Sequence, residues 1–146
     1  LRKKLILVGD GKNREDLEQY VSNQKMQEQI IFVGKRYDVQ NFYTAASVYV
    51  HSSPLEGLPT VLLEAMTYGV PIAATNSIPG VPEILQNEKC GLISNVFDAE
   101  GLADNIYKLY TDQLLIENLV NAGKERIKEF SPEAVQVKIQ KYICEL

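Results

Sequence analysis

Two carboxylates, Glu56 and Glu64, stand eight positions apart with Pro59 between them. Carboxylates accept hydrogen bonds from ligand hydroxyls, and they also serve as acids, bases or electrostatic stabilisers in catalysis. Proline fits the first turn of a helix, because its fixed φ is helical and a helix start does not need its missing N–H. We therefore predict that Glu56 lies on a loop after a strand at 48–50, and that Glu64 lies in the first turns of a helix.

The start of this predicted helix has the properties of an anion site. Free N–H groups at Thr60 and Val61 and the positive end of the helix dipole favour a bound phosphate. Glu64 lies about five residues into the helix, ~7.5 Å along its axis, and side chains tilt toward a helix N-terminus. The segment could therefore hold a phosphate at the helix start, a hydroxyl-bearing ring beside Glu64 and a polar group beside Glu56. A sugar nucleotide has parts that fit all three places.

The flanking sequence alternates short apolar runs with helical patterns, which predicts βαβ units and a parallel sheet. The predicted strands are residues 5–8, 30–33, 48–50, 72–74 and 91–93, and the first of them reads as buried on both faces. The fold class is α/β, a Rossmann-like parallel sheet with helices on both faces and a helical C-terminal tail. Right-handed crossovers place the carboxyl ends of the strands at one edge, where ligands of such folds bind. The loops expected at that edge are 9–12, 34–37, 51–59 and 75–80.

Several helix boundaries can be predicted from single residues. Asn13, Asp98 and Ser131 are expected at N-cap positions, and Gly69 is a natural C-terminal stop. On the helix that carries Glu64, the predicted buried side consists of Leu62, Ala65, Met66 and Gly69. The last helix, 132–145, has apolar residues on more than one side, which suggests the hypothesis that it drives dimerisation.

Composition excludes several classes of protein. A length of 146 residues suits one domain, and a net charge of −4 without basic clusters argues against a nucleic-acid surface. No apolar run approaches the roughly 20 residues that span a bilayer. The two cysteines, Cys90 and Cys144, are far apart, which favours a reducing compartment over a zinc site or disulfide framework. Because the sequence opens at Leu1 and runs into a strand, we expect a fragment from the interior of a longer protein.

Other motifs are weaker. A glycine pair, Gly9 and Gly11, follows the first strand, but Arg14 stands where a dinucleotide-binding fingerprint needs its third glycine. Gly11 could still let a ligand approach the backbone. The 35–37 loop reads equally well as a solvated turn or as a ligand contact. His51 stands at the end of a predicted strand, where a lone histidine is more often a structural residue than a catalytic base. No GxSxG elbow supports a hydrolase.

The segment from Glu56 to Met66, continued by Gly69-Val70-Pro71, resembles the E-x7-E signature of retaining GT-B glycosyltransferases of the group 1 family. The resemblance covers nearly the whole chain, and the helices after Asp98 carry no motif of the family and add little to the match. It implies a fold of two Rossmann-like domains facing a cleft, of which this chain matches the C-terminal, nucleotide-sugar-binding domain. Residues 1–146 would then be a single domain that lacks its first strand and the N-terminal acceptor domain.

The resemblance also implies a role for each site residue. Glu56 is the catalytic residue that contacts the donor sugar, and Glu64 accepts hydrogen bonds from the ribose hydroxyls. The other implied contacts are backbone N–H groups near Gly57 and Leu58 for the sugar, Thr60 and Val61 for the diphosphate, and Lys35, Arg36 and Tyr37 for the base. Two departures stand out: Pro59 replaces a glycine that can donate an N–H, and the family's basic pair for the diphosphate would precede Leu1.

The implied reaction is transfer of a sugar from a nucleotide-sugar, with UDP as the family's usual nucleotide, to a glycan or lipid-linked acceptor. Retention of configuration is expected, with no metal and no other cofactor. The full-length protein is expected in the cytoplasm, with peripheral association at the inner face of the membrane left open. The alternatives are another GT-B enzyme, such as an epimerase or phosphorylase, and a non-catalytic nucleotide-sensing or interaction module. A phosphorylase would need a pyridoxal lysine, and no lysine here stands in a suitable motif.

Overall fold

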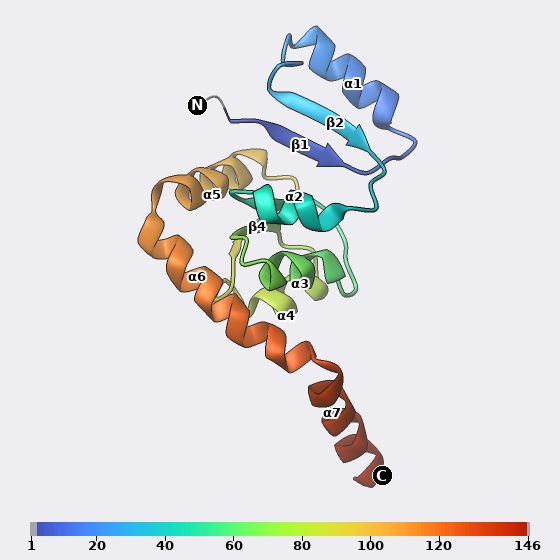
Figure 1. Cartoon of the computed structure of the whole chain (residues 1–146), viewed down its shortest axis with the longest axis vertical. Coiled ribbons are helices and arrows are strands. Elements are labelled where there is room, and N and C mark those ends of the chain that lie inside the picture. Colours follow the sequence, from blue (N-terminus) through green and yellow to red (C-terminus); the bar gives the residue numbers. More distant parts are fainter. Residues whose placement is uncertain (1–2, 146) are drawn as a thin grey trace. The chain divides into compact units, whose positions relative to one another are not determined.

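The computed structural model describes residues 3–145, and the chain forms two compact units, Leu1–Phe42 and Tyr43–Leu146. Figure 1 shows the order of the elements along the chain. Each unit is described by itself.

The first unit is a βαβ motif. Strand β1 (Leu5–Val8) and strand β2 (Ile30–Gly34) are parallel neighbours, with Leu5 opposite Ile30, and helix α1 (Arg14–Asn23) connects them. Asn13 is the N-cap residue of α1 as predicted, but its side chain makes no capping hydrogen bond. The prediction that β1 is buried on both faces is wrong, because Leu5 is 45% exposed. A single neighbouring strand and a single intervening helix cannot cover both faces of a strand.

The second unit contains a three-stranded parallel sheet. Its strands are β3 (Tyr49–His51), β4 (Ile72–Thr75) and β5 (Leu92–Ser94), and β4 lies between the other two. All four residues of β4 are buried, as expected for the central strand. Among the described residues the predicted strands therefore pair in two sheets, one in each unit. The pairing is parallel throughout, and the α/β class is confirmed.

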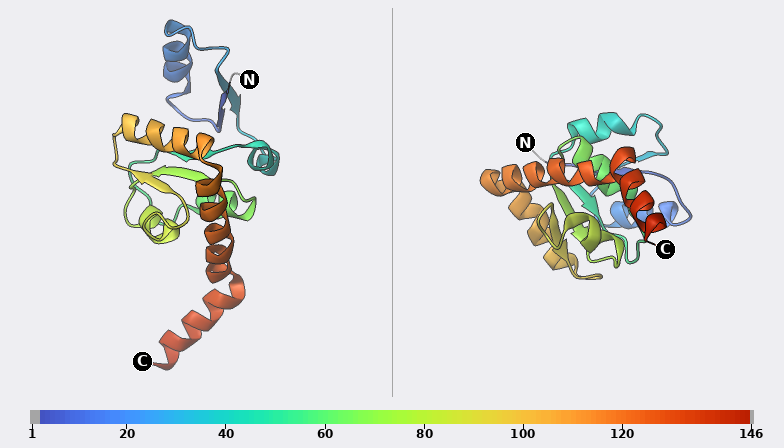
Figure 2. Two further views of the ribbon diagram at one scale, coloured as in Figure 1. Left: turned by 90° about the vertical axis from the view of Figure 1, so that its left-hand side faces the viewer. Right: turned by 90° about the horizontal axis from the view of Figure 1, so that it is seen from below.

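Helices pack against both faces of this sheet. Helices α3 (Thr60–Thr67) and α4 (Gly80–Leu85) connect successive parallel strands, and right-handed crossovers place both on one face. Helix α5 (Ala99–Thr111) packs on β4 and β5 from the opposite side (Figure 2). Helix α6 (Gln113–Arg126) follows α5 and contacts α3. The core cluster joins Ala73 of β4, Leu109 of α5 and Leu119 of α6.

The helix ends follow the predicted signals. Gly69 ends α3 with a φ of +66°, a conformation that suits glycine. Asp98 caps α5 by accepting the N–H of Gly101, and Ser131 caps the last helix by accepting the N–H of Ala134. Asp112, which the sequence reasoning did not single out, caps α6 in the same way.

The tail consists of a short 3-10 helix, η1 (Ile127–Phe130), and helix α7 (Pro132–Cys144). None of the described residues of α7 is buried, and its apolar side chains are exposed: Val135, Val137, Ile139, Tyr142 and Ile143. Dimerisation through this helix stays a hypothesis. Across residues 3–145, no helix combines the length and the hydropathy needed to cross a membrane.

Candidate active site

Glu56 lies on the loop between β3 and α3, as predicted. Its backbone is fixed by an isolated parallel bridge to Pro79 and by the N–H of Gly80, which donates to the Glu56 carbonyl at 3.2 Å. The carboxylate is only partly buried, and its Oε1 lies 3.3 Å from Nε2 of His51. Glu56 is therefore held by its backbone while its side chain remains open to a ligand.

His51 ends β3, and its ring is nearly buried. Burial lowers the pKa of His51, while the nearby Glu56 carboxylate opposes that shift with a smaller effect. Nε2 is close to Glu56 but is not aligned for a hydrogen bond. The lowered pKa keeps the imidazole neutral near pH 7.

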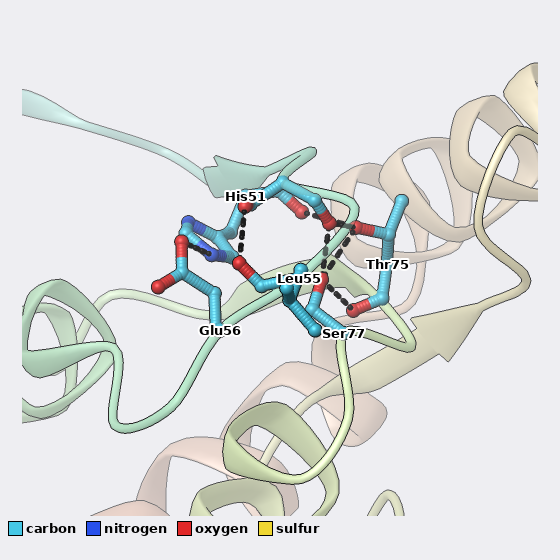
Figure 3. Close-up of polar contacts among 6 residues, drawn as sticks. His51, Leu55, Glu56, Thr75 and Ser77 are labelled. Carbon is cyan, nitrogen blue, oxygen red and sulfur yellow. Dashed lines mark hydrogen bonds and ion pairs between the residues drawn. The ribbon is translucent and has the colours of Figure 1, made fainter.

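Two buried hydroxyls hold the loop that carries Glu56 (Figure 3). Thr75 Oγ1 donates to the Ser53 carbonyl at 2.6 Å, and the hydroxyl of Ser77 donates to the same carbonyl. Ser77 is fully buried. From the sequence, Thr75 and Ser77 are expected on a loop at the binding edge of the sheet, without an assigned role. The only available signal was that hydroxyl side chains follow the end of a buried strand.

Gly80 allows the two loops to meet. A Cβ at this position would lie 2.5 Å from the carbonyl oxygen of Gly57 and 2.6 Å from Cδ of Pro59. Real Cβ atoms do not approach so closely, so only glycine fits here without a shift of the backbone. Gly57 and Leu58 themselves are exposed, which leaves their backbone accessible to a ligand.

Helix α3 begins as predicted, with Pro59 at the N-cap and without a side-chain cap. Thr60 is exposed and Val61 is half-buried, so the first turn faces outward in part. Leu62, Ala65 and Met66 form the buried side, and Gly69 is only half-buried. Glu64 is half-buried, and its Oε2 accepts a hydrogen bond from the hydroxyl of Tyr43 at 3.1 Å. Glu64 and Thr60, four residues apart, share the outer side of the helix.

The remaining predicted site residues lie in the first unit. Lys35, Arg36 and Tyr37 line a cavity of about 410 Å³ that Asp38 and Gln40 complete. Arg36 forms a bidentate pair with Asp38, at 2.8 and 2.9 Å, and this pairing lowers the pKa of Asp38 to about 2. Tyr37 is 88% exposed. This loop therefore has both a charged pair and an exposed ring that a ligand could stack on.

Gly11 is also in the first unit, where its N–H is bonded to the side chain of Asp10 at 2.9 Å. A Cβ at Gly11 would meet nothing within 4 Å. The described neighbours therefore do not require glycine here, and the space around the backbone is open, as a close ligand approach would need.

A second cavity, of about 440 Å³, lies beyond the ends of β4 and β5, and no sequence signal pointed to it. Its polar groups are in part used by the fold, since Glu88 accepts the N–H of Ile93 and Asp98 caps α5. Within residues 3–145 there is no cluster of three or more histidine, cysteine, aspartate or glutamate side chains that could hold a metal ion.

Comparison with known proteins identifies the family. Residues 2–126 match the family described as glycosyl transferases group 1. N-acetyl-alpha-D-glucosaminyl L-malate synthase of Bacillus anthracis is 33% identical over 126 residues, which cover 86% of this chain and 33% of the synthase. An alpha-1,4-N-acetyl-D-galactosaminyltransferase of Campylobacter jejuni is 29% identical over 98% of this chain and 39% of its own length. The chain thus spans between a third and two fifths of the length of these relatives.

Solved structures share the fold. Anabaena HepE, determined in complex with UDP, superposes with a TM-score of 0.87 at 21% identity and covers 99% of this chain and 41% of its own. Sucrose-phosphate synthase from Thermosynechococcus elongatus gives a TM-score of 0.82 at 27% identity over 97% of this chain and 38% of its own. Because the family match extends over residues 2–126 and the fold agrees with it, the chain belongs to the group 1 glycosyl transferases.

Proposed function

We propose that this chain is the donor-binding part of a retaining glycosyltransferase that transfers a sugar from a UDP-sugar to a glycan or lipid-linked acceptor. One observation carries the proposal: a single segment presents Glu56 on a backbone fixed by the 75–80 loop and Glu64 on the outer side of α3. Between them lies a helix start without a side-chain cap, which suits a phosphate.

Solved structures with the same fold support the choice of nucleotide. HepE was determined with UDP and with UDP-glucose, and its fold matches this chain with TM-scores of 0.87 and 0.85. At 21 and 22% identity these matches concern the fold, so the choice of UDP is part of the proposal.

Each predicted residue then has a defined task. Glu56 faces the donor sugar, while the exposed backbone at Gly57 and Leu58 donates to sugar hydroxyls. The N–H groups of Thr60 and Val61 bind the diphosphate, and Glu64 accepts hydrogen bonds from the ribose. The remaining contacts, to the base, come from Lys35, Arg36 and Tyr37, with Gly11 allowing close approach of the ligand.

In the reaction, the bond between the anomeric carbon and the diphosphate oxygen breaks, and its electron pair leaves with the diphosphate. A bond forms between the anomeric carbon and an acceptor oxygen on the same face, and the acceptor proton leaves with the departing group. The preorganised dipole of α3 stabilises the charge that develops on the diphosphate. We propose that no metal takes part, so full turnover should persist in excess EDTA. Loss of turnover in EDTA with recovery on adding Mg²⁺ or Mn²⁺ would contradict this part.

The relatives suggest the class of acceptor. Two relatives have undecaprenol in their names: the Campylobacter jejuni enzyme, and an alpha-1,3-galactosyltransferase of Escherichia coli named for GlcNAc-diphosphoundecaprenol. We propose a glycan or lipid-linked acceptor that is bound by a separate N-terminal domain. If the acceptor is lipid-linked, the enzyme would act at the cytoplasmic face of a membrane.

The decisive experiment uses the full-length protein with UDP-, GDP- and ADP-sugars. Glu56→Gln is expected to abolish transfer while leaving the affinity for nucleotide unchanged, and Glu64→Gln is expected to weaken nucleotide binding. Normal turnover of Glu56→Gln would show that the role given to Glu56 is wrong. Nucleotide binding without turnover of any sugar would instead favour the non-catalytic sensing module.

A further inference from the structure

Tyr43 connects helix α2 (Val39–Ala45) to the proposed ribose ligand Glu64. Its side chain is buried, and its hydroxyl lies 3.1 Å from Glu64 Oε2 and 3.4 Å from the Val61 carbonyl oxygen. A phenol has one proton to donate at a time. The carboxylate is both closer and charged, so it is the stronger acceptor.

Two other tyrosines fix the ring of Tyr43. Tyr68, at the C-cap of α3, stacks on it with ring centroids 5.6 Å apart and an interplanar angle of 7°. The ring of Tyr49 of β3 also packs against it, with ring centroids 5.5 Å apart and an interplanar angle of 50°. Aromatic pairs in such arrangements add stability beyond the area that they bury. The position of the hydroxyl is thus set by packing against β3 and α3, and it does not depend on a ligand.

The hydroxyl is held in its donating form. Burial, together with the neighbouring Tyr49 and Glu64, raises the pKa of Tyr43 well above its ordinary value of 10. A protonated phenol beside a carboxylate can only be the donor in that bond. Because the bond engages Oε2 of Glu64, the half-buried side chain keeps its second oxygen for another donor.

We propose that Tyr43 is a positioning residue for nucleotide binding: it anchors one oxygen of Glu64 and orients the other toward the ribose hydroxyls. The proposal rests on the proposed function, in which Glu64 binds the ribose. It assigns to α2, the element before β3, a part in recognising the donor.

The test is Tyr43→Phe in the full-length protein, which keeps the stacked ring and removes only the hydroxyl. Calorimetric binding of UDP is expected to weaken about tenfold, the loss typical of a hydrogen bond to a charged group. Binding of 2′,3′-dideoxy-UDP, which lacks the ribose hydroxyls, is expected to be unchanged by the substitution. In turnover, KM for the donor should rise while kcat stays near the wild-type value. Tyr68→Phe, in the same aromatic stack, is the matched control and should leave both affinities unchanged.

The outcomes distinguish a failure of the role of Tyr43 from a failure of the proposed function. If Glu64→Gln leaves UDP affinity unchanged, the ribose role of Glu64 fails and the inference fails with it. If Glu64→Gln weakens UDP binding but Tyr43→Phe does not, only the inference is overturned. Equal weakening of UDP and dideoxy-UDP by Tyr43→Phe would also overturn it, because that pattern indicates a general structural role. In the Glu64→Gln background, Tyr43→Phe is expected to cause no further loss of UDP affinity, which would support the inference. This comparison also avoids a carboxylate left without its hydrogen-bond donor, because residue 64 is then an amide.

Discussion

The imidazole of His51 lies 3.3 Å from a carboxylate oxygen of Glu56, yet burial holds the pKa of His51 below its ordinary value of 6.5. Desolvation of the ring therefore outweighs attraction to the neighbouring carboxylate. The pair acts as a neutral imidazole beside a carboxylate at neutral pH, which leaves Glu56 without a fixed counter-charge from this residue.

His51 is the single histidine of the chain, so its titration can be followed by NMR without assignment ambiguity. We expect a midpoint below 6.5, and a lower one still in Glu56→Gln, because that change removes the attraction that raises the pKa. Below pH 6.5 the unfolded state binds more protons than the folded state. The stability that His51 contributes is therefore complete above 6.5 and is lost as the pH falls through the folded-state pKa. A midpoint above 6.5 would mean that the Glu56 contact dominates burial.

Gly80 makes a second residue-level prediction. Gly80→Ala must displace the Gly57 carbonyl or Pro59, since the added Cβ would come within 2.6 Å of both. We expect a loss of about 1–3 kcal/mol in the free energy of unfolding, typical of overpacking, and lower transfer activity through the shifted Glu56 loop. Gly57→Ala adds a Cβ that meets nothing within 4 Å, so its stability should stay within about 0.5 kcal/mol of wild type. Urea denaturation measures the free energy of unfolding of both variants. Equal losses for Gly80→Ala and Gly57→Ala would contradict the predicted clash.

The position of helix α3 is fixed by contacts to the loop that precedes it and by a contact to a side chain of the helix itself. The hydroxyls of Thr75 and Ser77 tie the preceding loop to the end of β4, and Tyr43 of α2 binds a side chain of α3 itself. The helix therefore presents its first turn from a fixed frame, as preorganised electrostatic stabilisation requires.

The cap of α5 gives a prediction for an element outside the site. Asp98 Oδ1 accepts the N–H of Gly101 at 2.9 Å, which satisfies one of the free donors at the helix start. Asp98→Ala should lower the free energy of unfolding by about 1 kcal/mol, whereas Asp98→Asn, which keeps an acceptor oxygen, should stay close to wild type. Urea denaturation of the 146-residue chain decides this. If the two variants are equally destabilised, the charge and not the capping bond is what matters.

The parts of this chain that align with the two curated relatives described above cover 33% and 39% of those relatives' lengths. Transfer needs an acceptor held against the donor, and we assign the acceptor to a separate domain. The 146-residue chain alone is therefore expected to bind donor weakly and to transfer no sugar, whereas transfer is expected of the full-length protein. Incubation with radiolabelled UDP-sugar and acceptor measures this directly. Transfer by the 146-residue chain without an added domain would refute the division of labour.

Local patterns were enough to predict much of this protein. Pro59 and Gly69 mark the two ends of α3, and the apolar spacing of Leu62, Ala65 and Met66 gives its buried side. These features depend on backbone dihedrals and helical periodicity, which neighbouring residues determine. The alternation of strands and helices likewise predicts a parallel α/β fold, and the spacing of Glu56 and Glu64 points to the family.

Contacts between distant segments could not be predicted in this way. The burial of β1 was predicted wrongly, because an apolar run specifies a strand but not how many neighbours cover it. Nothing in the spacing of Tyr43, Ser77 and Gly80 shows that they meet the loop or helix of the two acids, since those meetings depend on how the chain packs. The sequence by itself thus determined on which kind of element each of the two carboxylates stands, Glu56 on a loop and Glu64 on a helix. Only the tertiary structure decided what holds them, because hydrogen bonds and close approaches between segments twenty or more residues apart exist only once the sheet and helices have packed.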